Sequence, residues 1–144
     1  MLPQPSSVAP GRPVRALGHD GLDEEHRVQF ELIDAVAEAV AAGREAEEVD
    51  TAVGRLIEYL RAHFLSEQLL MERHRFPQRE THAREHDHAI ELLEDLKRRH
   101  AVGVTRWSLD SIRLLRDWLA GHVSGADRSL VSFLEAAGLP LSRG

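Results

Sequence analysis

The sequence predicts an all-α protein, an antiparallel up-down-up-down four-helix bundle with an extended N-terminal arm. Four long segments place apolar residues at spacings of three and four, which is the period of a helix that buries one face. Short connections join these segments, so consecutive helices should run antiparallel. Almost no segment alternates apolar and polar residues as a half-buried strand would.

The division of the chain follows from its length and its prolines. A chain of 144 residues with 42% hydrophobic residues suits one domain with a single core. Residues 1–16 hold four of the six prolines and too few apolar residues to fold alone. We therefore expect a flexible arm in residues 1–16 and the helical bundle in residues 17–144.

The first helix is expected to begin near Asp23, where three successive acidic residues favour the positive end of a helix dipole, and to end at Gly43. The second should cover about residues 47–74 and stop before Pro77, because proline disfavours helical geometry in the preceding residue. The inward stripes are His26, Phe30, Ile33, Ala37 and Val40 in the first helix, and Val53, Leu56, Leu60, Phe64, Leu70 and Met71 in the second.

The third helix should cover about residues 79–100. The fourth is expected to begin after Trp107, with Ser108 as its N-cap, and to end before Gly138. The inward stripes are Ile90, Leu93 and Leu96 in the third helix, and Leu109, Ile112, Leu115, Leu119, Val123, Leu130 and Phe133 in the fourth.

Composition excludes several classes of protein. The chain has 18 Lys and Arg against 24 Asp and Glu, a formal charge of −6, whereas nucleic-acid binding needs a concentrated basic face. No apolar run approaches the roughly 18 residues that span a bilayer, and no secretory signal pattern is visible, so we expect a cytoplasmic location. Cysteine is absent, which excludes disulfides, thiolate metal sites and cysteine nucleophiles.

The histidine content is unusual, with nine histidines beside only seven aromatic residues. In an antiparallel bundle the starts of the first and third helices lie beside the ends of the second and fourth. Seven side chains of the metal-binding kind then fall within roughly 5–20 Å of one end of the bundle, at 1.5 Å rise per residue. They are His26, His63, Glu67, His82, His86, His122 and Asp127.

Spacing supports this metal site. His63 with Glu67, and His82 with His86, are four residues apart, so each pair projects from one helix face. His122 and Asp127 are five apart, about 140° out of register on an ideal helix. Gly121 and Gly125 flank this stretch, and a local bulge or bend there would bring Asp127 inward.

The number of donors favours two iron ions. Five imidazoles and two carboxylates exceed what one tetrahedral zinc ion can use, and imidazole with carboxylate suits iron. If Glu67 and Asp127 bridge two irons together with one solvent-derived oxygen, three histidines complete six ligands on one iron. Two histidines leave the other iron five-coordinate, with a place for a small diatomic molecule.

Four motifs carry a resemblance to a known family. They are LDEEHRVQF around His26, YLRAHFLSEQLLM with His63 and Glu67, FPQRETHAREH with His82 and His86, and DWLAGHVSGAD with His122 and Asp127. Over about residues 17–130 the sequence resembles the hemerythrins, particularly the single-domain bacteriohemerythrins. The family pattern includes the same spacing between its last histidine and aspartate.

The resemblance implies roles for these residues. His82, His86 and His122 would ligate the six-coordinate iron, His26 and His63 the open one, with Glu67 and Asp127 bridging. The protein would bind dioxygen, or another small diatomic molecule, reversibly and without turnover, for storage, delivery or scavenging. The ligand pocket is expected to be lined by Gln29, Phe64, Trp118, Leu119 and Val123. Gln29 stands where the family commonly has leucine, and Gln68 where an acidic residue often follows the bridging glutamate.

Two other functions remain open at this point. One is a sensor of oxygen, nitric oxide or redox state that acts through an unidentified protein partner. The other is a di-iron enzyme with peroxidase-like activity, although turnover needs a proton donor and Gln29 is a poor one. The remaining histidines are expected outside the site, His19 and His88 at the surface, His74 at the rim and His100 too distant. Glu85 with His88 copies half of a ferritin-like motif, and we interpret it as chance.

Overall fold

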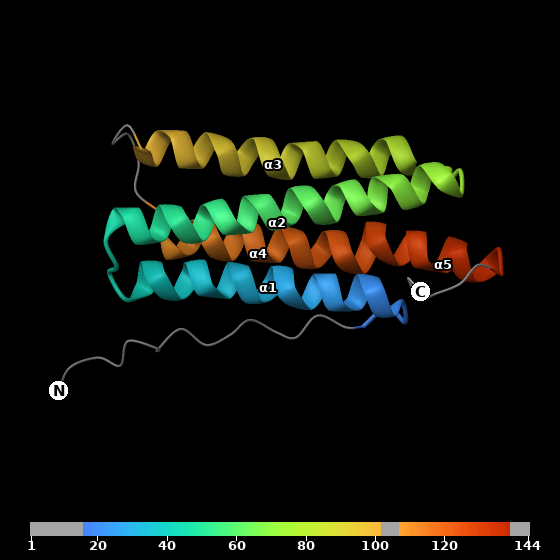
Figure 1. The fold of residues 1–144 in the computed structure, drawn as a ribbon, viewed down its shortest axis with the longest axis horizontal. Helices are drawn as coiled ribbons and strands as arrows, with labels where there is room; N and C mark the ends of the chain where they lie inside the picture. Colours follow the sequence, from blue (N-terminus) through green and yellow to red (C-terminus); the bar gives the residue numbers. More distant parts are fainter. Residues whose placement is uncertain (1–15, 102–106, 139–144) are drawn as a thin grey trace.

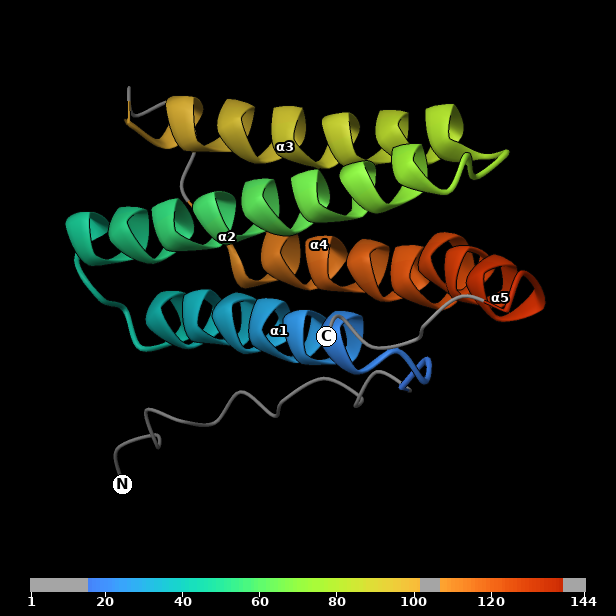
Figure 2. The same ribbon diagram turned by 45° about the vertical axis from the view of Figure 1, so that its right-hand side comes forward.

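The computed structural model describes residues 16–101 and 107–138. Four helical rods lie side by side and antiparallel (Figures 1 and 2), which confirms the predicted all-α bundle. The described residues contain no β-strand. The elements are α1 (Asp20–Ala41), α2 (Ala46–Arg73), α3 (Arg79–Ala101), α4 (Leu109–His122), a π-helical turn η1 (Val123–Asp127) and α5 (Arg128–Ala136).

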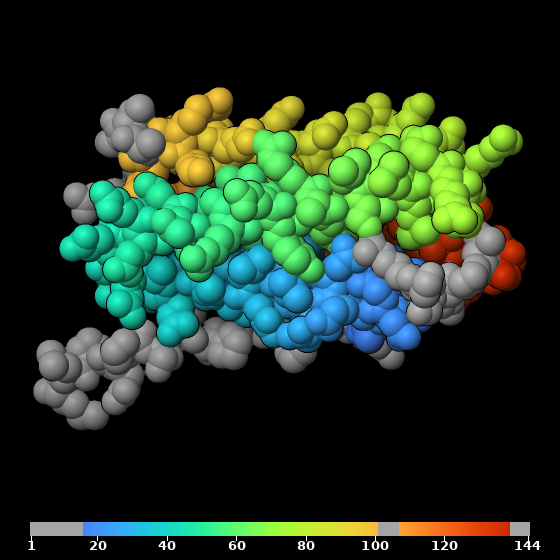
Figure 3. Space-filling view, viewed as in Figure 1, coloured from blue at the N-terminus to red at the C-terminus, as the bar shows by residue number. Residues whose placement is uncertain are grey.

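The fourth rod consists of α4, η1 and α5 without a break. α1 contacts α2 and α4, and α2 contacts α3. The space-filling view shows α1 and α2 packed along each other over one face, with α5 at the end where α2 finishes (Figure 3). Of the expected arm in residues 1–16, all but the last residue lies outside the described residues.

The start of α1 corrects the prediction. α1 begins at Asp20, three residues before Asp23. The Asp23 carboxylate instead accepts hydrogen bonds from the backbone N–H groups of Leu17 at 2.7 Å and Gly18 at 3.0 Å. His19 is the N-cap, because its Nδ1 accepts from the N–H of Leu22 at 3.1 Å. The expected surface position of His19 was therefore wrong, since capping places its ring inside at 2% exposure.

The other helix limits agree with the prediction to within about one residue. α1 ends beside Gly43, whose φ of +66° is the left-handed conformation that glycine adopts readily after a helix. Its N–H donates to the carbonyl of Val40 at 3.1 Å, which satisfies one of the last carbonyls of the helix. Ser108 caps α4 as predicted, and its hydroxyl accepts from the N–H of Ser111 at 3.1 Å.

Apolar side chains from all four rods form the core. Its central part includes Ile33, Leu56, Leu93 and Leu115, one from each rod. A smaller cluster closes the end of the bundle, where α5 meets the turn between α2 and α3; its buried members are Met71, Phe76, Leu130 and Leu134. Six of the predicted inward residues are only half-buried: Val40, Leu70, Ile90, Leu96, Leu109 and Phe133.

No helix in the described part of the chain is both long enough and apolar enough to cross a membrane.

Candidate metal centre

The seven predicted donor residues meet at one end of the bundle. Each is at most 4% exposed. All four rods contribute, with one or two donors from each rod. They form two groups of donor atoms in which all atoms lie within 4.8 Å of one another. One group is Glu67, His82, His86, His122 and Asp127, and the other is His26, His63, Glu67 and Asp127. We refer to them as the three-histidine group and the two-histidine group.

Asp127 belongs to both groups because its two oxygens face opposite ways. Its Oδ1 lies 2.9 Å from Nε2 of His82 and 3.3 Å from Nε2 of His122. Its Oδ2 lies 2.9 Å from Nε2 of His26, in the two-histidine group. One carboxylate therefore offers one oxygen to each group, which is the arrangement of a bridging ligand.

Glu67 repeats this arrangement. Its Oε1 lies 3.0 Å from Nε2 of His86 and 3.2 Å from Nε2 of His82. Its Oε2 lies 3.4 Å from Nε2 of His63 and 3.7 Å from Nε2 of His26. Both carboxylates thus lie between the two groups, with one oxygen directed at each.

A π-helical turn makes the position of Asp127 possible. η1 follows His122 directly and widens the helix, so that residues five apart share a face. His122 and Asp127 are both buried as a result, and the predicted local bulge is confirmed. The wide turn disturbs the regular hydrogen bonds of the helix, and the hydroxyl of Ser124 donates to the carbonyl of Ala120 at 2.8 Å. The one donor that ideal helix geometry could not place is therefore aimed by this turn.

Several donor atoms lack a partner of their own. Within the described residues, Nε2 of His26, Nε2 of His63, Oε2 of Glu67 and both oxygens of Asp127 are buried without a hydrogen bond of acceptable geometry. Leaving so many polar atoms unpaired is costly, each by about 1–3 kcal/mol. Nitrogen and oxygen lone pairs that converge in this way fit cations, and the imidazole and carboxylate set suits iron.

The electrostatics of the centre are dominated by the two carboxylates. Burial lowers the pKa of His63, but the charge of Glu67 and the contact with Glu25 raise it to about 10. Burial also lowers the pKa of His82, and the close contacts with Asp127 and Glu67 raise it to about 9.

The carboxylates themselves stay ionised. Burial and the charge of Glu67 raise the pKa of Asp127, but the close contacts with His122, His26 and His82 bring it down to about 2. Burial raises the pKa of Glu67 too, and the charge of His63 with its histidine contacts holds it well below the usual range. A metal that binds here must therefore displace protons from the histidines, so its affinity depends on pH.

Two glutamates support the histidines from outside, and the sequence analysis missed both roles. Oε1 of Glu25 lies 3.1 Å from Nδ1 of His63, and Oε1 of Glu85 lies 3.6 Å from Nδ1 of His122. The hydrogen bond between Glu25 and Nδ1 fixes the orientation of His63 and leaves its Nε2 for a metal, whereas Nδ1 of His122 has no hydrogen-bond partner among the described residues. Each glutamate directly precedes a donor histidine, His26 or His86, and reaches across to the next rod. That position in the sequence is the signal that could have identified them.

Aromatic rings cover the three-histidine group. The Phe64 ring stacks on His86 with centroids 3.9 Å apart, and Trp118 stacks on His122 with centroids 5.3 Å apart. Phe64 thus lies against a histidine that we expect at the six-coordinate iron, not at the open one. The other predicted pocket residues, Gln29, Leu119 and Val123, are buried at 1% exposure or less.

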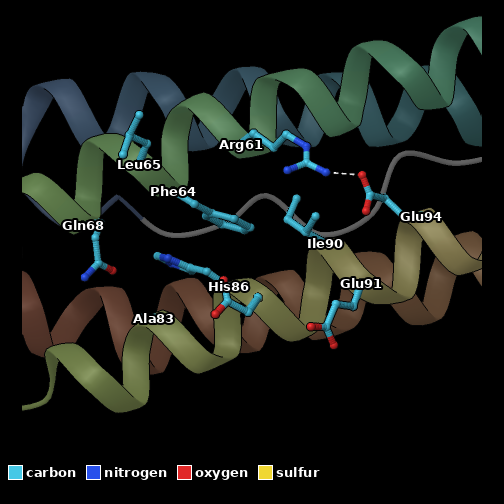
Figure 4. Close-up of a pocket in the computed structure, with 10 residues that line it drawn as sticks. Arg61, Phe64, Leu65, Gln68, Ala83, His86, Ile90, Glu91 and Glu94 are labelled. Atoms are coloured by element: carbon cyan, nitrogen blue, oxygen red, sulfur yellow. Dashed lines mark hydrogen bonds and ion pairs between the residues drawn. The ribbon is translucent and has the colours of Figure 1, made fainter.

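A groove of about 610 Å³ between α2 and α3 leads from the surface to this covered side. Figure 4 shows Phe64 and His86 facing each other at its floor, with Gln68 and Ala83 beside them. An ion pair between Arg61 and Glu94 crosses the groove further along. Among the described residues, His86 is the donor that lines this groove.

The four remaining histidines lie outside the two donor groups. His88 is exposed, as predicted, and His74 is half-buried. His100 lies toward the opposite end of the bundle, where its Nδ1 contacts Oδ1 of Asp50 at 2.8 Å. His19 caps α1.

Comparison with known proteins decides the family. A family model described as the hemerythrin HHE cation-binding domain matches residues 17–134 of this chain. The chain belongs to the hemerythrin family. The resemblance expected from the four sequence motifs is confirmed.

Hemerythrin relatives match most of the chain. A bacteriohemerythrin of Ralstonia nicotianae is 32% identical over 122 residues, which is 85% of each protein. A bacteriohemerythrin of Methylococcus capsulatus is 27% identical over 106 residues, 74% of this chain and 80% of that protein. The crystal structure of a wild-type hemerythrin superimposes with a TM-score of 0.74 at 26% identity, covering 78% of this chain and 85% of that one.

Proposed function

We propose that this protein binds dioxygen reversibly at a non-haem di-iron centre, for storage, delivery or scavenging. The observation that carries the proposal is the pair of donor groups that share Glu67 and Asp127 and differ by one histidine. A shared carboxylate pair fits two ions side by side, and the smaller group leaves one ion with fewer ligands.

The seven donors divide between the two ions. His82, His86 and His122 would hold one iron, His26 and His63 the other, and Glu67 and Asp127 would bridge them. When bound, the iron pair supplies electrons and an open coordination position for a small diatomic molecule. Glu25 orients the imidazole of His63, and Glu85 adds a negative charge near His122.

The surroundings of the donor residues favour binding over turnover. Leu119 and Val123 are fully buried close to His122, and they keep bulk water away from the centre. The buried polar residue one helical turn from His26 is Gln29, and an amide has no acidic proton to give at neutral pH. A peroxidase-like reaction would need such a proton donor.

Anaerobic reconstitution tests the proposal. The purified protein is loaded with ferrous iron, its metal content is measured, and air is admitted while the absorption spectrum is recorded. We expect about two irons per chain and a charge-transfer band that disappears under vacuum and returns with air. His88→Ala, a change at an exposed histidine, should behave like the unmodified protein.

Two results would contradict the proposal. One is fewer than about two irons per chain after reconstitution. The other is a band that bleaches irreversibly in air while an added reducing substrate is consumed, which would indicate a di-iron enzyme.

A further inference from the structure

Among the described residues, Gln29 is the buried side-chain amide that the metal centre and the core leave unexplained. Its side chain is 1% exposed, and within the described residues neither Nε2 nor Oε1 has a hydrogen-bond partner. An unpaired primary amide in the interior destabilises a fold, whereas an apolar residue of similar shape would not. A ligand that pairs with the amide would offset this loss.

Helix direction places Gln29 in the layer of side chains next to the donor histidines, one helical turn farther from the metal end of the bundle. α1 and α3 run away from the metal end, and α2 and α4 run toward it (Figure 1). The residues three after His26 and His86, and three before His63 and His122, therefore lie about one helical turn deeper. These residues are Gln29, Ala89, Leu60 and Leu119, and none is more than 1% exposed.

The layer beneath that one is apolar on all four rods. It consists of Ile33, Leu56, Leu93 and Leu115, seven residues from the same four histidines, each at most 4% exposed. The Gln29 amide is thus enclosed by hydrocarbon side chains within its own layer and by hydrocarbon below. Polar side chains lie on one side of it, in the layer that contains His26 and His63.

We propose that Gln29 is a ligand-recognition residue, whose Nε2 donates a hydrogen bond to a small ligand held on the two-histidine side of the centre. The inference rests on the proposed function and deepens it, because it names the property that the ligand must have. The centre would favour small ligands whose outer atom accepts a hydrogen bond, and azide is a suitable probe. A hydrogen bond to a charged acceptor in a dry pocket is among the stronger ones.

The test compares Gln29→Met with the unmodified protein in two measurements. Azide is titrated into the oxidised, iron-loaded proteins, and its dissociation constant is read from the visible spectrum. The loss of one such hydrogen bond should weaken azide binding about tenfold. In the metal-free proteins, Gln29→Met should raise the urea midpoint of unfolding, because the substitution removes an unpaired buried amide. Gln78→Met makes the same change at an exposed glutamine and should alter neither value.

Each outcome separates the two proposals. If the unmodified protein binds azide and Gln29→Met binds it within about twofold as tightly, Gln29 does not recognise the ligand and only the inference is wrong. The inference is also wrong if metal-free Gln29→Met is less stable than the unmodified protein, since the amide would then have a partner in the fold. If the unmodified protein holds neither two irons nor azide, the proposed function and the inference both fail.

Discussion

The two donor groups share two carboxylates and differ in what surrounds their histidines. Around the three-histidine group, Phe64 stacks on His86 and Trp118 stacks on His122, with ring planes within about 10° of parallel. In the two-histidine group, the rings of His26 and His63 meet edge to face, at 76° and with centroids 5.0 Å apart.

The two donor groups therefore differ in how their histidines are held. Stacked aromatic rings restrict two of the three imidazoles in the three-histidine group, His86 and His122. On the two-histidine side, the buried amide of Gln29 lies one helical turn from His26, and we propose that it recognises a ligand there. Experiments that remove shared donors, group-specific donors or supporting residues should affect the two sides differently.

The largest effect is expected from the shared carboxylates. Asp127→Asn and Glu67→Gln should weaken iron binding at both positions by more than about 100-fold, because each removes a charge and a bridging ligand. Metal content after reconstitution and desalting measures this. Glu72→Gln, on the exposed side of α2, is the control. If either variant keeps two irons, that carboxylate does not bridge.

Removal of a donor from the two-histidine group should separate the two positions. His63→Leu leaves all five residues of the other group intact, so we expect about one iron per chain and no dioxygen band. His88→Leu, two residues from a donor but exposed, should keep both irons. If the His63→Leu protein still binds dioxygen, the open coordination position does not belong to the two-histidine group.

The supporting glutamates should have unequal effects. The side chain of Glu25 is 17% exposed and lies 3.1 Å from His63, so Glu25→Gln should weaken iron affinity on that side about tenfold. The side chain of Glu85 is 41% exposed and 3.6 Å from His122, and solvent screens its charge. Glu85→Gln should therefore change iron affinity less than about threefold. Competition with a coloured chelator measures both, and equal losses would show that burial does not matter here.

The smallest effect concerns stability and pH. His63 and His82 have pKa values of about 10 and 9 in the fold, above the value of about 6.5 that histidine has in an unfolded chain. Stability from their protonation is therefore complete below about pH 6.5 and is lost as pH rises toward 10. The chelator-treated protein should lose several degrees of Tm over this range, followed by circular dichroism.

The iron-loaded protein is the control for this last experiment. Iron takes the place of the protons on His63 and His82, so its Tm should change less between pH 6.5 and 10 than that of the metal-free protein. A metal-free Tm that is flat across this range would contradict the assigned protonation of the two histidines.

The sequence was sufficient for the fold and for the convergence of the donors. Helix direction places all seven donors at one end of the bundle, and helical spacing turns them inward except for Asp127, which faces inward through the π-helical turn. Their role as iron ligands remains a proposal.

Other features depended on tertiary contacts that spacing does not encode. Glu25 and Glu85 reach neighbouring rods, which requires the rotation of one helix against the next. The start of α1 was misjudged because Asp23 bonds the backbone N–H groups of Leu17 and Gly18 before the helix, and a histidine took over the cap. The acidic run that begins at Asp23 therefore lies inside α1 and does not mark its start.

The π-helical turn η1 also makes the last rod sensitive to a change in its length. Buried positions in α4 come at Ile112, Leu115, Leu119 and His122, and beyond the turn they resume at Asp127, Leu130 and Leu134. An uninterrupted α-helix would bring each of the later three inward one residue sooner. Deletion of one amino acid between His122 and Asp127 would therefore turn Asp127, Leu130 and Leu134 outward together. Replacing an amino acid in the same stretch would not change which later positions face inward.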